Sequence, residues 1–387
     1  MTLNLPADNL WATAAVWLAF GTAAALCARR LGLAAALVEI LFGVLAGNAI
    51  GLRSNAWIDF VAGFGSIMLT FLAGAEIEPA VLRKQLRPAA AIGTISFAVP
   101  FLGAIAYAYY VAHWTPDASK IAGVAMSTTS VAVVYAVMVE SRLSGSNFGQ
   151  LILAACFITD LGTVVALGLL FANYNGWLLG LVAGIAAAIL LVPKLLAAVF
   201  ERTRRSVSEP GLRLLFLIIV SLSALATAAK SEGVLPAYFL GLACAGFMFA
   251  NPEIARRVRS MAMGFLTPFY FLKAGTLVSI PAAVAGIWAI AAFFAVKLAA
   301  KCLGVFPAAR AFGHVPKHAS YITLMMATGL TFGTISSLYG LTHHYIDQAQ
   351  YTTLVTVVIL TAIVPTIVAQ RFFHPQEFVD PEDLGVP

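Results

Sequence analysis

The sequence predicts an all-α integral membrane protein with about thirteen transmembrane helices. Of its 387 residues, 61% are hydrophobic and only 10% are charged. The mean hydropathy of +0.92 lies far above that of soluble domains. A helix needs about 20 apolar residues to cross a bilayer, and such stretches follow one another along the chain. Only short loops and a C-terminal tail remain, so we expect no soluble nucleotide-binding or regulatory domain.

The predicted spans can be taken in chain order. They cover residues 11–28, 31–52, 57–75, 89–112, 119–139, 149–172, 176–199, 212–230, 233–250, 262–280, 283–307, 317–340 and 350–371. The first sixteen residues contain Asp8 and no Lys or Arg, and the basic pair Arg29 and Arg30 follows the first span. This order is typical of a first transmembrane helix with an outer N-terminus, rather than of a cleaved signal peptide.

Basic residues are distributed unevenly between the two sides of the membrane. With an outer N-terminus, the inner loops and tail hold sixteen Lys and Arg residues, and the outer loops hold Arg53, Lys120 and Lys230. This asymmetry predicts a multi-pass protein of the cell inner (plasma) membrane with a cytoplasmic C-terminus. The net charge of +6 is then a signal of topology, and we expect no nucleic-acid partner.

Asp160 lies near the bilayer centre of the span 149–172. A carboxylate in hydrocarbon costs about 2.5–3.5 kcal/mol, so such a residue indicates a path for ions or protons. Desolvation favours the protonated acid, whereas a nearby cation favours the ionised one. Protons and Na⁺ would therefore compete for Asp160. Hydroxyl and carbonyl oxygens suit a hard cation, and Thr129, Ser130 and Thr159 are the expected additional ligands.

Two spans contain segments that weaken a helix. Ser127–Ser130 is a run of four hydroxyl residues at mid-membrane, and Thr328–Thr334 combines Gly329 and Gly333 with three threonines, including Thr331. The hydroxyls, including that of Thr128, could hydrogen-bond to carbonyls of their own helix. Alternatively, both segments are unwound and expose carbonyls and helix ends to a cation, as in transporters with two repeats.

Among the other charged residues within predicted spans, four are candidates for a role in transport or in packing. Lys301 and Lys297 are one helical turn apart on the same face. They could pair with Asp160 when no cation is bound or offset the ends of broken helices, and Lys297 could instead be packed or snorkelling. Glu39 could line the cation path, and Lys273 could face a cavity between domains or stabilise an interface.

Cysteine and histidine give no sign of a metal centre or catalytic site. Cys27, Cys156, Cys244 and Cys302 lie singly in predicted spans without paired spacing, so we expect them to be packing residues. The histidines, serines and acids form no believable hydrolytic arrangement. We therefore expect neither an enzyme nor a protein with a cofactor.

Several motifs resemble those of a known family. They are Phe157–Gly162, Thr129–Ser130, Gly329–Phe332, Lys301–Gly304, Leu33–Gly51 and Phe71–Glu78. The first four are similar to the paired-acid, unwound and lysine motifs of the antiporters NhaA and NapA, and the last two look like runs of Kef-type proteins. On this resemblance the chain is identified as a member of monovalent cation:proton antiporter family 2, nearest to the NapA, GerN or Kef membrane type.

The resemblance implies an NhaA-like fold with inverted repeats and two crossing broken helices. It implies a panel domain of residues 1–80 and 212–280 that forms a homodimer, and a core ion-transport domain of residues 89–172 and 281–371. Residues 176–211 would form a linker helix and loop, and residues 372–387 a short cytoplasmic tail. The family's first paired acid is replaced by Thr159, and the acid of its unwound segment by Ser130. Asp160 is then the single carboxylate of the site, which suggests one proton per cation.

The predicted function is secondary antiport. By this prediction a monovalent cation, foremost Na⁺ and otherwise Li⁺ or K⁺, is exchanged for protons by alternating access at Asp160. The alternatives are a channel-like K⁺ efflux protein, a regulated Kef-type K⁺/H⁺ antiporter, and a membrane sensor. A channel would more often need a ring of subunits with a filter-like repeat, and a sensor would need an output domain.

Overall fold

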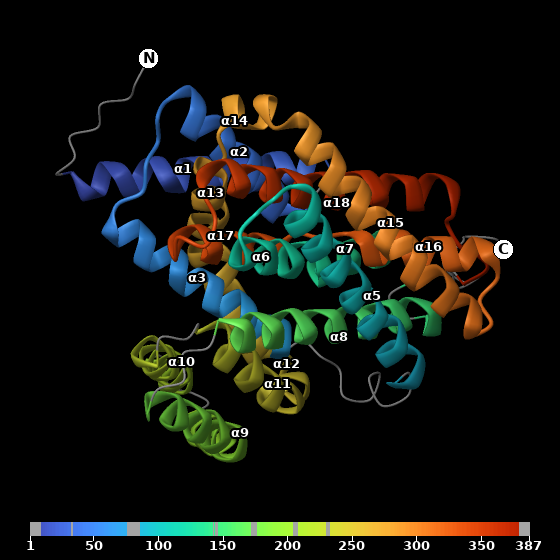
Figure 1. Cartoon of the computed structure of the whole chain (residues 1–387). Helices are drawn as coiled ribbons and strands as arrows, with labels where there is room; N and C mark the ends of the chain where they lie inside the picture. The colour runs from blue at the N-terminus through green and yellow to red at the C-terminus, as the bar shows by residue number, and fades with distance from the viewer. Residues whose placement is uncertain are drawn as a thin grey trace. The chain divides into compact units, whose positions relative to one another are not determined.

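Helices make up the regular structure of the described residues in the computed structural model (Figure 1). The structure describes residues 9–31, 34–75, 86–141, 143, 146–171, 176–203, 208–229 and 233–378. Parts of two motifs, Leu33 and residues 76–78, lie outside them. The longer helices are α1 (Leu10–Leu31), α3 (Ala56–Ala75), α5 (Leu86–Ala106), α8 (Asn147–Leu170), α9 (Gly176–Thr203), α10 (Pro210–Ala228), α15 (Ile287–Ala311) and α18 (Gln348–Phe372).

Shorter helices complete the order. They are α2 (Ala35–Ala49), α6 (Pro116–Ser127), α7 (Val131–Glu140), α11 (Val234–Ala250), α12 (Pro252–Met261), α13 (Thr267–Thr276), α14 (Ile280–Ala285), α16 (Pro316–Ala327) and α17 (Thr331–Thr342). Tyr107–Val111 and Ala262–Leu266 are π-helical, and Gln376–Phe378 is a 3₁₀ turn. The helices fall into two compact units. Described residues of 1–59, 81–163 and 271–387 form the first unit, and those of 60–80 and 164–270 form the second.

Each predicted span falls on helical structure, but not every span is one long helix. Among the described residues, nine helical segments are long and apolar enough to cross a membrane, counting α16 with α17 as one. The helices α2 and α11 are apolar but have only 15 and 17 residues. The predicted span 119–139 is divided into α6 and α7, and the span 262–280 begins with a π-helix before α13. The total of thirteen spans remains a prediction.

Glycines allow close helix packing in both units. In the first unit, a Cβ atom on Gly43 of α2 would lie 2.2 Å from the carbonyl oxygen of Leu272 in α13, and one on Gly275 would lie 2.1 Å from that of Ile40. In the second unit, a Cβ atom on Gly241 would lie 2.1 Å from the carbonyl oxygen of Phe71. Small residues that let backbones approach in this way are typical of membrane helix interfaces, where apolar burial gives little net attraction.

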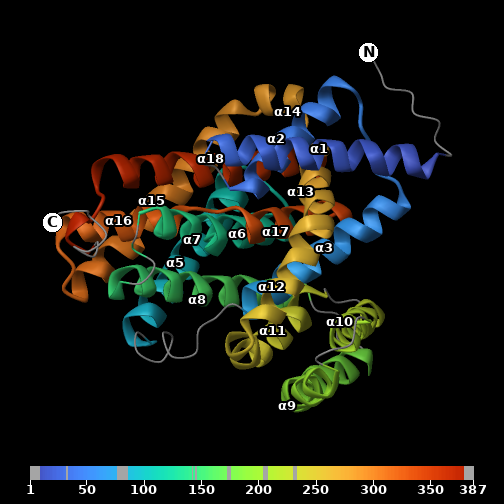
Figure 2. The same cartoon turned by 180° about the vertical axis from the view of Figure 1, so that it is seen from behind.

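The broken helices lie at the centre of the first unit. Figures 1 and 2 show α6, α7, α16 and α17 in one layer beside α18. Large apolar side chains fill the space around this layer, and Phe148, Tyr321 and Met325 are among those that are fully or almost fully buried. The rigid packing of this core fixes the position of the polar segments described next.

Candidate ion-binding site

Both weakened segments interrupt their helices. The helix α6 ends at Ser127 and α7 begins at Val131, while α16 ends at Ala327 and α17 begins at Thr331. Three residues separate the half-helices in each case. Thr128 (φ −63°, ψ 151°) and Thr328 (φ −63°, ψ 130°) both have an extended backbone. The two breaks therefore free main-chain groups that a continuous helix would have paired.

The two breaks satisfy part of each other's hydrogen bonding. The backbone N–H of Ser130 donates to the carbonyl oxygen of Thr328 at 2.9 Å, and the Thr129 hydroxyl donates to the carbonyl oxygen of Met326 at 2.9 Å. Gly333 also packs closely here, because a Cβ atom on it would lie 2.7 Å from Val358 Cγ2 and 3.1 Å from the Thr128 hydroxyl oxygen. The structure thus brings the two predicted segments into direct contact.

Asp160 is a buried carboxylate with an unpaired oxygen. The residue is 1% exposed, and within the described part of the chain its Oδ1 has no hydrogen-bond partner. One turn earlier on α8, Cys156 lies beside α16, with its Sγ 3.7 Å from Met326 Sδ. Asp160 therefore continues a face of α8 that packs near the break after Ala327. A buried, incompletely bonded acid is costly, and such groups are characteristic of functional sites.

The two buried lysines of α15 have different neighbours. Lys301 Nζ donates to Ser96 Oγ at 2.7 Å, to the carbonyl oxygen of Ser127 at 3.0 Å and to Thr129 Oγ1 at 3.3 Å. These three acceptors match the three donors of an ammonium group. The position of Lys301 beside the last carbonyl of α6 favours a cation at that half-helix end.

Lys297 lies at the other break. Its Nζ donates to Thr361 Oγ1 at 3.4 Å, and a Cβ atom on Gly329 would lie 2.4 Å from it. Both lysines are 0% exposed, so Lys297 is a packed residue and does not reach the membrane surface. The structure thus separates the two lysines, which share one helix face in the sequence, into one for each broken helix.

Some predicted ligands are directed into the surrounding helices. The Thr159 hydroxyl donates to the carbonyl oxygens of Gly93 at 3.2 Å and Ala155 at 3.0 Å, which ties α8 to α5. Ser130 Oγ accepts from the backbone N–H of Val133 at 3.4 Å, as a residue that caps the start of α7 would. Thr331, at the start of α17, is partly exposed.

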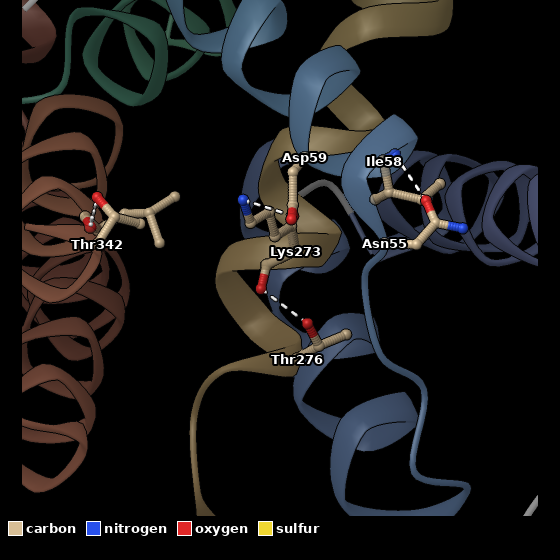
Figure 3. A network of polar contacts seen from close by, with 7 residues as sticks. Asn55, Ile58, Asp59, Lys273, Thr276 and Thr342 are labelled. Atoms are coloured by element: carbon tan, nitrogen blue, oxygen red, sulfur yellow. Dashed lines mark hydrogen bonds and ion pairs between the residues drawn. The ribbon is translucent and has the colours of Figure 1, made fainter.

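Glu39 and Lys273 lie on other helices. Glu39 is buried in α2, with an exposed fraction of 4%. Lys273 Nζ lies 2.8 Å from Asp59 Oδ1, so α13 is joined by an ion pair to the first turn of α3 (Figure 3). The Thr276 hydroxyl donates to the carbonyl oxygen of Lys273 at 2.8 Å in the same region. No pattern in the sequence indicates Asp59 as this partner.

Sequence reasoning anticipated exposed carbonyls in the segment Ser127–Ser130, but it missed Ser96, Thr361 and the carbonyl oxygen of Met326. A single hydroxyl residue in an apolar helix has no spacing pattern that marks it as a contact of a lysine 205 residues away. The signal that could have found Ser96 is its polarity within the apolar span 89–112.

The chain is similar to known membrane antiporters in sequence and in structure. Residues 15–374 match the family model described as "Sodium/hydrogen exchanger, transmembrane". The chain is 25% identical over 274 residues to the putative Na⁺/H⁺ antiporter YjbQ of Bacillus subtilis, covering 65% of this chain and 44% of that protein. It is 22% identical over 345 residues to the Na⁺/H⁺-K⁺ antiporter GerN of Bacillus cereus, covering 87% and 89%. The solved structure of the sodium proton antiporter MjNhaP1 from Methanocaldococcus jannaschii has a TM-score of 0.69 at 16% identity, covering 92% and 95%.

Proposed function

This chain belongs to the transmembrane sodium/hydrogen exchanger family, and from this premise we propose that it is a secondary antiporter that uses Asp160 as a shared site for protons and a monovalent cation. The observation that carries the proposal is the buried Asp160 carboxylate, whose Oδ1 has no partner among the described residues. Na⁺ is the first candidate, and Li⁺ or K⁺ are the others.

The proposed exchange follows from the chemistry of one carboxylate. When Asp160 is protonated it is neutral, and burial favours this form; when a cation arrives, the ionised form is stabilised and the proton leaves. If the protein changes between inward-facing and outward-facing states only with one of the two bound, cation and proton flow in opposite directions. The hydroxyl of Thr129 and carbonyl oxygens at the first break are the proposed supplementary ligands, because hard cations prefer oxygen.

Lys301 is the proposed counter-charge of the empty site. Its ammonium is held near the first break by Ser96, Ser127 and Thr129, and there it offsets Asp160 when the acid is ionised without a cation. The proposal gives Ser130 a capping role and Thr159 a packing role, since their hydroxyls are engaged with backbone groups. With Asp160 as the single acid, we propose an exchange of one proton for one cation.

The proposed architecture has inverted repeats with two crossing broken helices. It has a core of residues 89–172 and 281–371, and a panel of residues 1–80 and 212–280 that forms a homodimer. The N-terminus would be outside and the C-terminus cytoplasmic. Support comes from the two breaks in contact, from the charge asymmetry of the loops, and from the structural likeness to a known antiporter.

Transport in sealed vesicles tests the proposal. Vesicles with an imposed pH gradient receive Na⁺, Li⁺ or K⁺, and a fluorescent pH indicator follows the gradient for the parent protein and for Asp160→Asn. We expect a cation to dissipate the gradient through the parent and not through Asp160→Asn, and the active cation identifies the substrate. Equal activity of the variant would refute a role of Asp160, and cation flux without proton movement would favour the channel-like alternative.

A further inference from the structure

The second half of the first unit repeats the element order of the first half. The helices α6 and α16 begin at Pro116 and Pro316, and their breaks are followed by α7 and α17 at Val131 and Thr331. The two pairs therefore have the same separation along the chain. The next helices, α8 and α18, begin at Asn147 and Gln348, so their separation is longer by a single residue.

Packing between α5 and α15 agrees with this register. A Cβ atom on Gly103 would lie 3.7 Å from Ala300 Cβ, and one on Gly304 would lie 3.2 Å from Val99 Cβ. When the start of α8 is aligned with the start of α18, Gly103 corresponds to Gly304 and Val99 corresponds to Ala300. The two contacts therefore exchange with each other in this register, as they must when two helices are related by a two-fold axis.

The same register pairs particular polar residues. Asp160 of α8 corresponds to Thr361 of α18, and Ser96 of α5 corresponds to Lys297 of α15. In the first repeat these two positions hold a buried acid, Asp160, and a short hydroxyl residue, Ser96. In the second repeat the acid is replaced by a threonine, and the hydroxyl residue is replaced by a buried lysine that donates to this threonine at 3.4 Å.

The surroundings of Lys297 Nζ are those of a bound cation. The position of a Cβ atom on Gly329 would lie 2.4 Å from Lys297 Nζ, 3.0 Å from Thr128 Oγ1 and 3.3 Å from Thr361 Oγ1, so the three atoms converge beside the second break. The hydroxyls of Thr128 and Thr361 donate to main-chain carbonyls at 3.0 and 2.9 Å. Their oxygen lone pairs therefore remain available to a positive charge.

We propose that Lys297 is a tethered cation that fills the second repeat's counterpart of the Asp160 site. The ammonium group takes the place of a free monovalent cation there, and the exchangeable cation binds in the first repeat only. This inference deepens the proposed function, on which it rests, because it explains how a fold with two related breaks exchanges a single cation. It assigns Lys297 a task different from that of Lys301, which has three acceptors at the first break.

The test inactivates the proposed Asp160 site and then removes the Lys297 side chain, so that a free cation could bind at its position. All samples are full-length protein with Asp160→Asn, and their thermal unfolding is followed while Na⁺, Li⁺, K⁺ or methylammonium replaces N-methyl-D-glucamine at constant ionic strength. Lys297→Ala leaves room for a free cation, whereas Lys297→Met removes the charge and keeps the volume. We expect a saturable rise of the unfolding midpoint in the alanine variant, and none in Asp160→Asn alone or in the methionine variant.

The opposite pattern overturns the proposal. It is wrong if the alanine variant gains no cation-dependent shift, or if the methionine variant gains the same shift. Because Asp160 is replaced in every one of these samples, failure here leaves the transport proposal intact. Failure of the vesicle assay would remove the function that the inference explains, without changing the result expected in these unfolding measurements, so the two failures are distinguishable.

A second set of variants does not depend on how well the alanine variant folds. Thr361→Asp places a carboxylate beside Lys297, and Thr361→Asn is its uncharged control. If the Lys297 ammonium is the cation of this site, it would pair with the new carboxylate and keep the unfolding midpoint of Thr361→Asp at or above that of Thr361→Asn. This advantage would disappear when Lys297→Met is added. If Thr361→Asp loses as much stability with Lys297 as without it, no cation is held there and the proposal is wrong.

Discussion

The two residues of the Asp59–Lys273 ion pair are unequally buried, so replacing one should reduce the stability of the protein more than replacing the other. The Lys273 side chain is 13% exposed and that of Asp59 is 46% exposed. Asp59→Asn leaves a largely buried ammonium without its charged partner, whereas Lys273→Met leaves a carboxylate that water can reach, near the favourable N-terminus of α3. We expect Asp59→Asn to be more destabilising by about 1 kcal/mol. Thermal unfolding of both single variants and the double variant measures this, and a greater loss from Lys273→Met would contradict it.

A substitution of Thr159 can distinguish a packing role of this residue from a role as an ion ligand. Its hydroxyl bridges α8 to α5 through Gly93. Within the described part of the chain, the Thr163 hydroxyl instead donates inside its own helix, to the carbonyl oxygen of Thr159 at 3.0 Å. We expect Thr159→Val to reduce stability by about 1 kcal/mol more than Thr163→Val, with exchange retained in both. Unfolding midpoints and vesicle transport are measured together. Loss of exchange at unchanged stability in Thr159→Val would instead make Thr159 an ion ligand.

At the scale of elements, the break between α16 and α17 leaves little room for a side chain at residue 329. Gly329→Ala would place a methyl group 2.4 Å from Lys297 Nζ and 3.0 Å from Thr128 Oγ1. The nearest atom is the far end of a flexible side chain, so the ammonium would be displaced from the break, at the lower end of the about 1–3 kcal/mol that overpacking costs. We expect slower exchange and a lower unfolding midpoint.

Two comparisons control this prediction. In Gly246→Ala of α11, the new Cβ atom would meet no described residue within 4 Å. This variant should leave both measurements unchanged or slightly raise the midpoint, since alanine suits a helix better than glycine by about 0.5–1 kcal/mol. Gly329→Ala should also cost less in a Lys297→Ala background, because residues in contact are not additive. Equal costs in both backgrounds would show that Lys297 is not the group displaced.

The breaks could be foreseen from composition, but their partners could not. Hydroxyl residues and glycines weaken a helix wherever it lies, so Ser127–Ser130 and Gly329 were informative without a structure. Which lysine serves which break depends on the crossing of α5 and α15 and on side-chain length. Lys297 and Lys301 are equivalent in helical periodicity, and only the three-dimensional packing distinguishes their acceptors.

At the scale of the whole molecule, hydropathy was sufficient to predict an integral membrane protein, and the motifs were sufficient to predict its family. The prediction of an all-helical membrane protein is confirmed, and so are the family resemblance and the expectation of a transporter rather than an enzyme. The count of spans was harder to derive, because α2 and α11 are short and α6–α7 is interrupted. A window of apolar residues does not reveal a helix boundary when the unwound residues, such as Thr128, are themselves compatible with burial.

The sidedness of two loop positions tests the span count and the topology together. Ala56, at the start of α3, and Ala311, at the end of α15, are both exposed. They lie on opposite sides only if an odd number of spans separates them. If the six long helices from α3 to α15 cross the membrane, this requires that one or all three of the divided α6–α7, the short α11 and α13 cross it as well. The charge asymmetry places Ala56 outside and Ala311 inside.

Cysteine labelling measures this arrangement. In a background without the four native cysteines, Ala56→Cys should react with a membrane-impermeant maleimide in intact cells, and Ala311→Cys only in inverted vesicles. Labelling of both from the same side would mean that one, or all three, of the irregular segments do not cross. Labelling of each from the opposite side to that expected would preserve the count and invert the topology. Whether the two positions are labelled from the same side or from opposite sides therefore tests the irregular helices. Which of the two is labelled from outside tests the orientation predicted from the loop charges, and neither result depends on the transported ion.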